Sequence, residues 1–174
     1  MSSRIDSDGL KLRLDATDIV SILTNREVID MLHENYSITI SDLGKSQIWK
    51  VWTEVNSWAI WDQELEATHL DQPFASGAHF KLKPKGGPWI RAELCDVTPG
   101  RCFGVLVRFP GARMRMDHNL EASPKGVTVT QGLSLEGPLA FIWRRLVFAK
   151  LAAGLAQQTE QLLHRSRQLQ SGVL

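Results

Sequence analysis

The segment "RMRMDHNLEASPKGVTVTQGLSLEGPLA" (residues 113–140) contains two strand-like runs, a turn and the start of a helix. Its first ten residues alternate like a strand with one face in water. Met114, Met116 and Leu120 share the apolar face, and His118 falls on that face between Met116 and Leu120. A buried imidazole requires a hydrogen-bond partner, whereas a valine would not. His118 is therefore the first candidate for a functional residue.

Composition limits the class of protein. The chain has 174 residues, of which 43% are apolar and 22% charged, as expected of one globular domain with or without an appendage. A formal net charge of +1 argues against a dedicated nucleic-acid binder. Neither a membrane-length apolar run nor a signal peptide is recognisable, so we expect no stable membrane insertion and a cytoplasmic location. Two cysteines are too few for a disulfide framework.

Upstream of this segment, the apolar pattern first has a strand period and then a helical one. Residues 35–42 predict a strand, and residues 46–63 predict two short helices separated at Asn56 and Ser57. Further strand-like runs cover residues 65–72, 78–84, 89–97, 102–109, 113–122 and 127–136. Proline and glycine mark their boundaries, which indicates tight turns between antiparallel neighbours.

Residues 1–33 form a predicted N-terminal appendage, and residues 34–174 form the main domain. "LDATDIVSILTN" (14–25) and "REVIDMLHE" (26–34) are interpreted as two short helices. Their apolar clusters are too small for an independent core, so we expect them to pack on the main domain or on a second copy. The sequence therefore leaves open whether the chain forms a homo-oligomer.

A long helix is predicted over residues 138–170, with Pro138 in its first turn. An apolar residue recurs every seven positions, at Phe141, Phe148, Leu155, Leu162 and Leu169. A coiled coil would suit this spacing, but the apolar sheet immediately upstream favours packing of the helix on the sheet.

The order of elements and several motifs resemble the START-like (SRPBCC) superfamily, especially its polyketide cyclase/dehydrase-like branch. The motifs are "VWTEVNSWAIWD" (51–62), "DQPFASGAHFKLKPKGG" (71–87), "VTPGRCF" (97–103) and "RMDHNLEASPKGVTVTQGLSLEGPLA" (115–140). The resemblance covers about residues 34–170. It implies an α+β helix-grip fold, in which a curved seven-stranded antiparallel sheet wraps around a long C-terminal helix. Two short helices follow its first strand.

The turns predict the register of the sheet. A two-residue turn at Pro110 and Gly111 places Phe103 opposite His118, and a loop over 123–126 places His118 opposite Gln131. A two-residue turn at Pro99 and Gly100 adds Asp96 to this row. Paired side chains lie about 5 Å apart, so Gln131 is expected to hydrogen-bond His118.

The family resemblance implies an internal cavity for an apolar ligand between the sheet and the long helix. We expect its lining to include Phe103, Val105, Val107, Met114, Met116, His118, Gln131 and Leu133. The leading hypothesis is binding of a small apolar or amphipathic molecule, lipid or polyketide-like. The alternatives are a cyclase or dehydratase that uses His118 for proton transfer, and a protein-interaction module. For His118 itself the favoured interpretation is a core residue that is hydrogen-bonded by Gln131, and a polar anchor or general acid/base at the floor of the cavity is the alternative.

Basic residues concentrate in three stretches, 81–91, 108–115 and 144–150, which hold ten of the twenty Lys and Arg residues and no acidic residue. Lys83, Lys85, Arg108 and Arg113 are the candidate pocket mouth, which would attract an anionic head group or an anionic membrane surface. The alternative is a solvated rim whose balancing acids lie nearby in space.

No metal or cofactor is expected. The five histidines lack the spacing of metal ligands, and the nucleophile-elbow, Walker A and dinucleotide-binding patterns are not found. Trp49, Trp52, Trp58 and Trp61 follow helical spacing, which favours core packing over a stacking platform.

Overall fold

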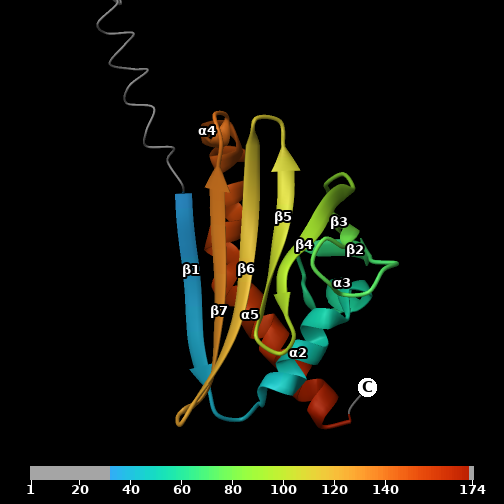
Figure 1. Cartoon of the computed structure of the whole chain (residues 1–174), viewed down its shortest axis with the longest axis vertical. Coiled ribbons are helices and arrows are strands. Elements are labelled where there is room, and N and C mark those ends of the chain that lie inside the picture. Colours follow the sequence, from blue (N-terminus) through green and yellow to red (C-terminus); the bar gives the residue numbers. More distant parts are fainter. Residues whose placement is uncertain (1–31, 173–174) are drawn as a thin grey trace, which may run out of the picture.

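A single antiparallel sheet organises the computed structural model, which describes residues 32–172 (Figure 1). The strand order is β1-β7-β6-β5-β4-β3-β2. The elements are β1 (Leu32–Ile40), α2 (Lys45–Thr53), η2 (Val55–Ser57), α3 (Trp58–Trp61), β2 (Leu65–His69), β3 (His79–Pro84), β4 (Ile90–Thr98), β5 (Cys102–Phe109), β6 (Ala112–Ser123), β7 (Gly126–Glu136), α4 (Ala140–Trp143), η3 (Arg144–Phe148) and α5 (Ala149–Gln170). This arrangement confirms the expected α+β class and the two short helices after the first strand.

The predicted register of the central hairpins is confirmed. Phe103 pairs with His118 across β5 and β6, and His118 pairs with Gln131 across β6 and β7. The β6–β7 connection is tighter than expected, because Ser123 and Gly126 already pair. Since side chains alternate along a strand, this register places His118 and Gln131 on the face of the sheet that packs against the core.

Asp96 was expected in the same row, and this prediction is wrong. The β4–β5 register shifts between Cys95 and Thr98, where Asp96 adopts a φ of 51°. This bulge turns the carboxylate to the outer face, where it accepts a hydrogen bond from Arg115 at 2.7 Å. The row on the inner face therefore consists of Phe103, His118 and Gln131.

The first strand begins earlier than predicted. Residues 32–34 belong to β1, so the helix expected over 26–34 is wrong at its end. The helix expected over 14–25 lies outside the described residues. Leu32 pairs with Leu135 of β7, which makes β1 an edge strand of the sheet.

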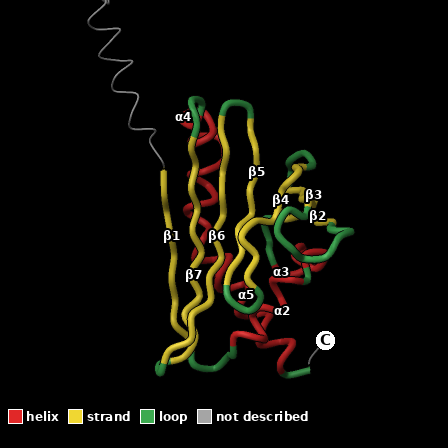
Figure 2. Tube along the Cα trace, viewed as in Figure 1, coloured by secondary structure: helices red, strands yellow, loops and turns green. Residues whose placement is uncertain are grey.

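The long C-terminal helix lies along one face of the sheet (Figure 2). It contains η3, a stretch of π-helix. A π turn holds an additional residue, so the positions upstream are rotated by about 100° relative to a continuous α-helix. Phe148 and Leu155 face the core, but Phe141 is 66% exposed. The predicted sevenfold stripe therefore reaches the core only from Phe148, the last residue of η3, onwards.

Two apolar clusters form the core between the sheet and the helices. The larger one joins α2, η2 and α3 to the sheet, and Trp52 and Trp58 are buried in it. The smaller one joins α4, η3 and the start of α5 to β6 and β7 around Phe148 and Leu133. The helical tryptophans therefore serve as core residues.

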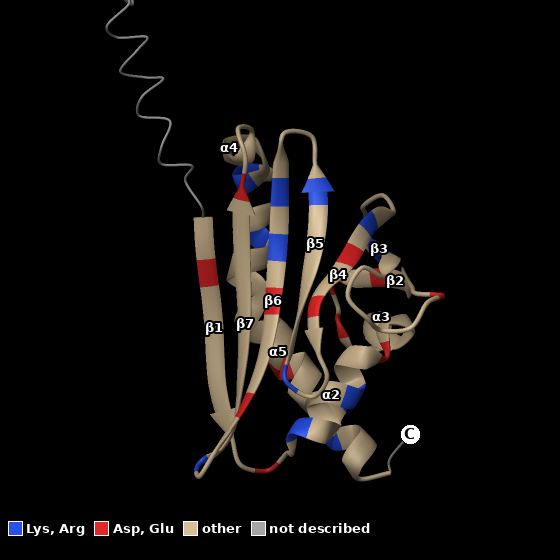
Figure 3. Ribbon diagram, viewed as in Figure 1, with Lys and Arg blue, Asp and Glu red and all other residues tan. Residues whose placement is uncertain are grey.

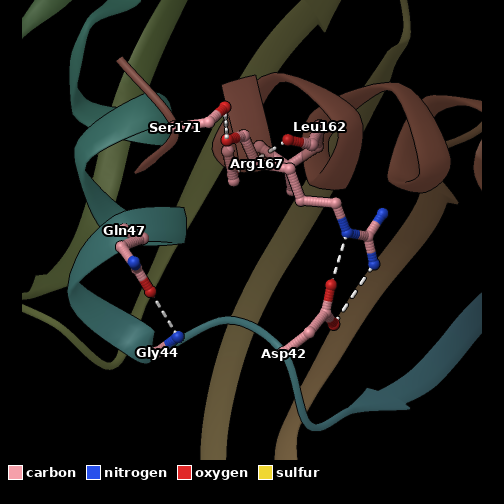
Figure 4. A network of polar contacts seen from close by, with 7 residues as sticks. Asp42, Gly44, Gln47, Leu162, Arg167 and Ser171 are labelled. Carbon is pink, nitrogen blue, oxygen red and sulfur yellow. Dashed lines mark hydrogen bonds and ion pairs between the residues drawn. The ribbon is translucent and has the colours of Figure 1, made fainter. Parts of the chain in front are cut away.

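Hydrogen bonds hold the C-terminal helix at both ends. Near its C-terminus, Arg167 donates from Nε and Nη2 to the Asp42 carboxylate in the β1–α2 loop, at 2.6 and 3.3 Å (Figure 4). At the opposite end, Trp143 Nε1 donates to the Pro110 carbonyl at 2.9 Å. The hydrogen bond with Arg167 lowers the pKa of Asp42. Within residues 32–172, no helix is both long and apolar enough to cross a membrane.

Candidate functional site

His118 lies in an aromatic pocket on the inner face of the sheet. Its ring stacks on Phe103, with ring centres 4.2 Å apart and planes inclined by 3°. The Trp52 ring of α2 meets it edge-on at 5.4 Å. β5, β6 and α2 thus fix the orientation of the imidazole.

The expected hydrogen bond from Gln131 does not satisfy the imidazole. His118 Nδ1 is shielded from solvent and has no hydrogen-bond partner within residues 32–172. Burial lowers the pKa of His118 from 6.5 to about 4, and backbone groups of Phe103 and Met116 only partly oppose this shift. The ring is therefore neutral at pH 7 and retains an unused polar atom in apolar surroundings.

The other predicted cavity residues lie on the same face of the sheet as this ring, Phe103, Val105 and Val107 in the larger core cluster and Met114 and Leu133 in the smaller one. Met116 is partly buried, whereas the remaining six are at most 3% exposed: Phe103, Val105, Val107, Met114, Gln131 and Leu133. Two surface hollows, of about 410 and 370 Å³, have other linings. The predicted cavity residues are thus brought together on one inner surface, with Met114 and Met116 as its flexible members.

The candidate pocket-mouth residues have a different environment. Lys83 pairs with Glu66 at 2.6 Å, Arg108 with Glu93 at 2.6 Å, and Arg113 with Glu136. Figure 3 shows Lys and Arg on β5 and β6 close to the turn that joins these strands.

These side chains alternate with the buried residues of their strands, so they project from the outer face of the sheet. Lys85 lies in the β3–β4 turn, where its backbone N–H donates to the Glu64 carbonyl. The ion pairs favour the alternative of a solvated rim with balancing acids. A role in attracting an anionic ligand stays a prediction.

Asp62 is a buried carboxylate that the sequence analysis missed. It follows α3 and accepts hydrogen bonds from Gln158 Nε2 at 2.6 Å and from the Glu64 backbone N–H at 2.9 Å. Burial raises the pKa of Asp62, and these two hydrogen bonds oppose the shift. The sequence has no signal that distinguishes a buried Asp at the end of a helix from a solvent-exposed one.

The face of α5 that carries Gln158 meets residues 62–64 through polar bridges. Lys150 pairs with Glu64 at 2.5 Å, and Gln161 accepts from the Gln63 backbone N–H at 3.3 Å. Gly154 lies between these bridges along the helix, and a Cβ added there would meet no neighbouring atom within 4 Å. Space is therefore left beside α5 at this position.

No group of three or more His, Cys, Asp or Glu side chains within residues 32–172 is arranged to hold a metal ion. The chemistry on the inner surface is thus that of aromatic rings, flexible thioethers, one amide and one neutral imidazole.

A curved antiparallel sheet that packs a long C-terminal helix, with apolar side chains between them, defines a protein of the helix-grip class. The family model described as "Polyketide cyclase / dehydrase and lipid transport" matches residues 31–168, and the chain belongs to this family. This confirms the resemblance inferred from the motifs.

Solved structures share the fold at low sequence identity. A hypothetical protein of Helicobacter pylori is 11% identical with a TM-score of 0.64, and the match covers 95% of this chain and 99% of that one. A Polyketide_cyc-like protein of Corynebacterium glutamicum is 19% identical with a TM-score of 0.54, covering 82% and 94%. The di-domain ARO/CYC protein StfQ of the steffimycin biosynthetic pathway is 10% identical with a TM-score of 0.65, covering 90% and 59%. No curated protein matches the sequence.

Proposed function

We propose that the protein binds a small, uncharged apolar molecule carrying a hydroxyl or carbonyl group between the sheet and α5. The observation that carries this proposal is His118, a neutral imidazole whose Nδ1 has no hydrogen-bond partner within residues 32–172. An unsatisfied buried polar atom costs about 1–3 kcal/mol, so a ligand that supplies the missing partner would recover this free energy. Family membership supports the same class of ligand.

The charge of the interior favours an uncharged ligand. The buried polar residues within 32–172 are Asp62, Gln131, Thr159 and Ser166, none of which is a cation. A carboxylate or phosphate that entered this interior would lose its hydration without gaining a counter-charge. The interior therefore favours an uncharged ligand over the anionic head group that the basic stretches suggest.

The state of His118 favours binding over proton transfer. General acid–base catalysis is most efficient when the pKa of the group lies near the working pH. Because the pKa of His118 is lowered to about 4, the ring is a weak base and is almost unprotonated at pH 7. We assign it the role of a polar anchor.

The affinities of naphthalene and 2-naphthol test whether His118 anchors the ligand. We expect 2-naphthol to bind about tenfold more tightly than naphthalene, since only the naphthol hydroxyl can pair with His118. His118→Phe keeps an aromatic ring next to Phe103 but removes Nδ1, so it should abolish this preference and leave naphthalene affinity nearly unchanged. Isothermal titration calorimetry at pH 7.5 measures both constants.

The anionic analogue 2-naphthoate and Arg113→Gln serve as controls. Arg113 lies on the outer face, so its substitution should change none of the affinities, and 2-naphthoate should bind more weakly than 2-naphthol. Equal affinities of wild type and His118→Phe for 2-naphthol would contradict the anchor. Tighter binding of 2-naphthoate that depends on Arg113 would instead favour the basic rim.

Variants of Gly154 test whether the ligand enters the interior through the space beside α5. Gly154→Ala should stabilise the protein by about 0.5–1 kcal/mol, because alanine is the better helix former and its Cβ meets no neighbour. Gly154→Phe should fill the space and slow 2-naphthol association in stopped-flow fluorescence, whereas Gly154→Ala should not. An unchanged association rate in Gly154→Phe would exclude this route.

A further inference from the structure

The outer side of α4 and η3 carries an apolar surface without a partner in residues 32–172. Phe141 and Leu146 are each 66% exposed, and Leu139 and Ile142 are also exposed. We call these four residues the α4 patch. A contiguous group of large apolar side chains on a protein surface commonly marks an interaction site. The π turn of η3 contributes to the patch, because the additional residue rotates Phe141 away from the face that carries Phe148.

Two cations accompany the patch. Arg144 and Arg145 are exposed and lie within the segment that carries the four apolar residues, and neither forms an ion pair within residues 32–172. Among residues 32–172 they differ in this respect from Lys83, Arg108 and Arg113, which have acidic partners. An occupant of the patch should therefore be apolar on one side and acidic at its margins.

The N-terminal segment meets this description and is attached close to the patch. β1 begins at Leu32, which pairs with Leu135 of β7 and packs against the core cluster around Phe148. Strand β7 ends at Glu136, only three residues before Leu139. The 31 preceding residues would span about 45 Å as a helix, which is ample length to reach α4 and η3.

The composition of the segment is complementary to the patch. Residues 1–31 contain six acidic and four basic side chains. The apolar positions Ile19, Ile22 and Leu23 recur with helical spacing. Two acids, Asp15 and Asp18, lie just before them in the sequence. One face of such a helix would be apolar, and its first turn would carry acids that can pair with arginines.

We infer that residues 14–31 bind the α4 patch of the same chain, with Ile19, Ile22 and Leu23 on Phe141 and Leu146 and the acids beside Arg144 and Arg145. The segment thereby covers the end of the domain where the β5–β6 turn meets α4. Family similarity starts at residue 31, so this cover is an addition to the helix-grip domain.

Hydrogen–deuterium exchange of the full chain tests the inference. We expect amides of residues 14–31 in the wild type to exchange at least about tenfold more slowly than an unstructured peptide, independently of protein concentration. The double variant Phe141→Gln, Leu146→Gln should lose this protection, because glutamine keeps the helix but removes the apolar contact. Ile60→Gln is the matched control, since Ile60 is 68% exposed on α3 and should leave the protection intact.

Four results would overturn the inference. The first is exchange of residues 14–31 at the unstructured rate in the wild type, and the second is protection that survives the double variant. The third is protection that disappears on dilution together with a dimer in sedimentation velocity, which would assign the patch to a second copy. Flotation of the wild type with vesicles of phosphatidylcholine and phosphatidylglycerol, lost in the double variant, would assign it to a membrane surface instead.

Discussion

Phe103→Ala should lower the free energy of unfolding by about 3–5 kcal/mol, as measured by urea unfolding at pH 7. The ring is 2% exposed and is surrounded by other rings. Phe74 lies edge-on at 5.0 Å, Trp52 at 5.4 Å and Trp49 at 5.9 Å, and His118 stacks at 4.2 Å. Truncation removes all of these contacts and leaves a cavity that the rigid neighbours cannot fill.

The matched control is Phe109→Ala on the same strand and the same face. Phe109 is partly buried and stacks on Trp143 with ring centres 4.4 Å apart. Its truncation should therefore lower the free energy of unfolding by less than half as much as Phe103→Ala. Phe103→Ala should also weaken 2-naphthol binding, because His118 loses the ring that fixes its plane. A loss of stability no larger than that of Phe109→Ala would show that the aromatic cluster is not the centre of the core.

The stability of the wild type should fall on acidification because of His118. Its pKa is lowered from 6.5 to about 4 on folding, so between these values the unfolded chain binds a proton that the folded protein does not. The stability present above pH 6.5 is therefore lost as the pH falls towards 4, by about 2 kcal/mol at pH 4.5. Urea midpoints at pH 7 and pH 4.5 measure this loss.

His118→Phe isolates this contribution from that of the carboxylates. The variant should be at least as stable as the wild type at pH 7, since it removes an unsatisfied buried nitrogen. Between pH 7 and pH 4.5, the free energy of unfolding of the variant should also fall by about 2 kcal/mol less than that of the wild type. Parallel pH dependence in the two proteins would mean that the imidazole is hydrated or already partnered.

The sequence predicted the fold well because the relevant signals are local. Alternation within a strand determines which side chains face the core, and a turn of known length determines the partner strand's register. That logic placed His118 opposite Phe103 and Gln131 without knowledge of the helices. It failed at Asp96, because a bulge at a non-glycine residue with positive φ leaves no mark on the apolar pattern.

The chemistry of the site depends on contacts that local patterns do not contain. The heptad spacing around Phe141 and Phe148 is continuous in sequence, and only the π turn separates their environments. The ring of Trp52, from a helix some 65 residues away, meets His118 edge-on in place of a hydrogen-bond donor. Likewise, the acids that pair with Lys83 and Arg108 come from other strands.

The two attachments of the C-terminal helix restrict how the domain can change shape. Arg167–Asp42 fixes one end and Trp143–Pro110 the other, so sliding of the helix along its axis would break both. Rolling about that axis would also strain both attachments, because each is made by a side chain that projects from the helix and turns with it. With both ends of the helix held, the ligand that we propose would have to be admitted by displacement of side chains along the middle of the helix and the sheet, and not by separation of the helix ends from the sheet.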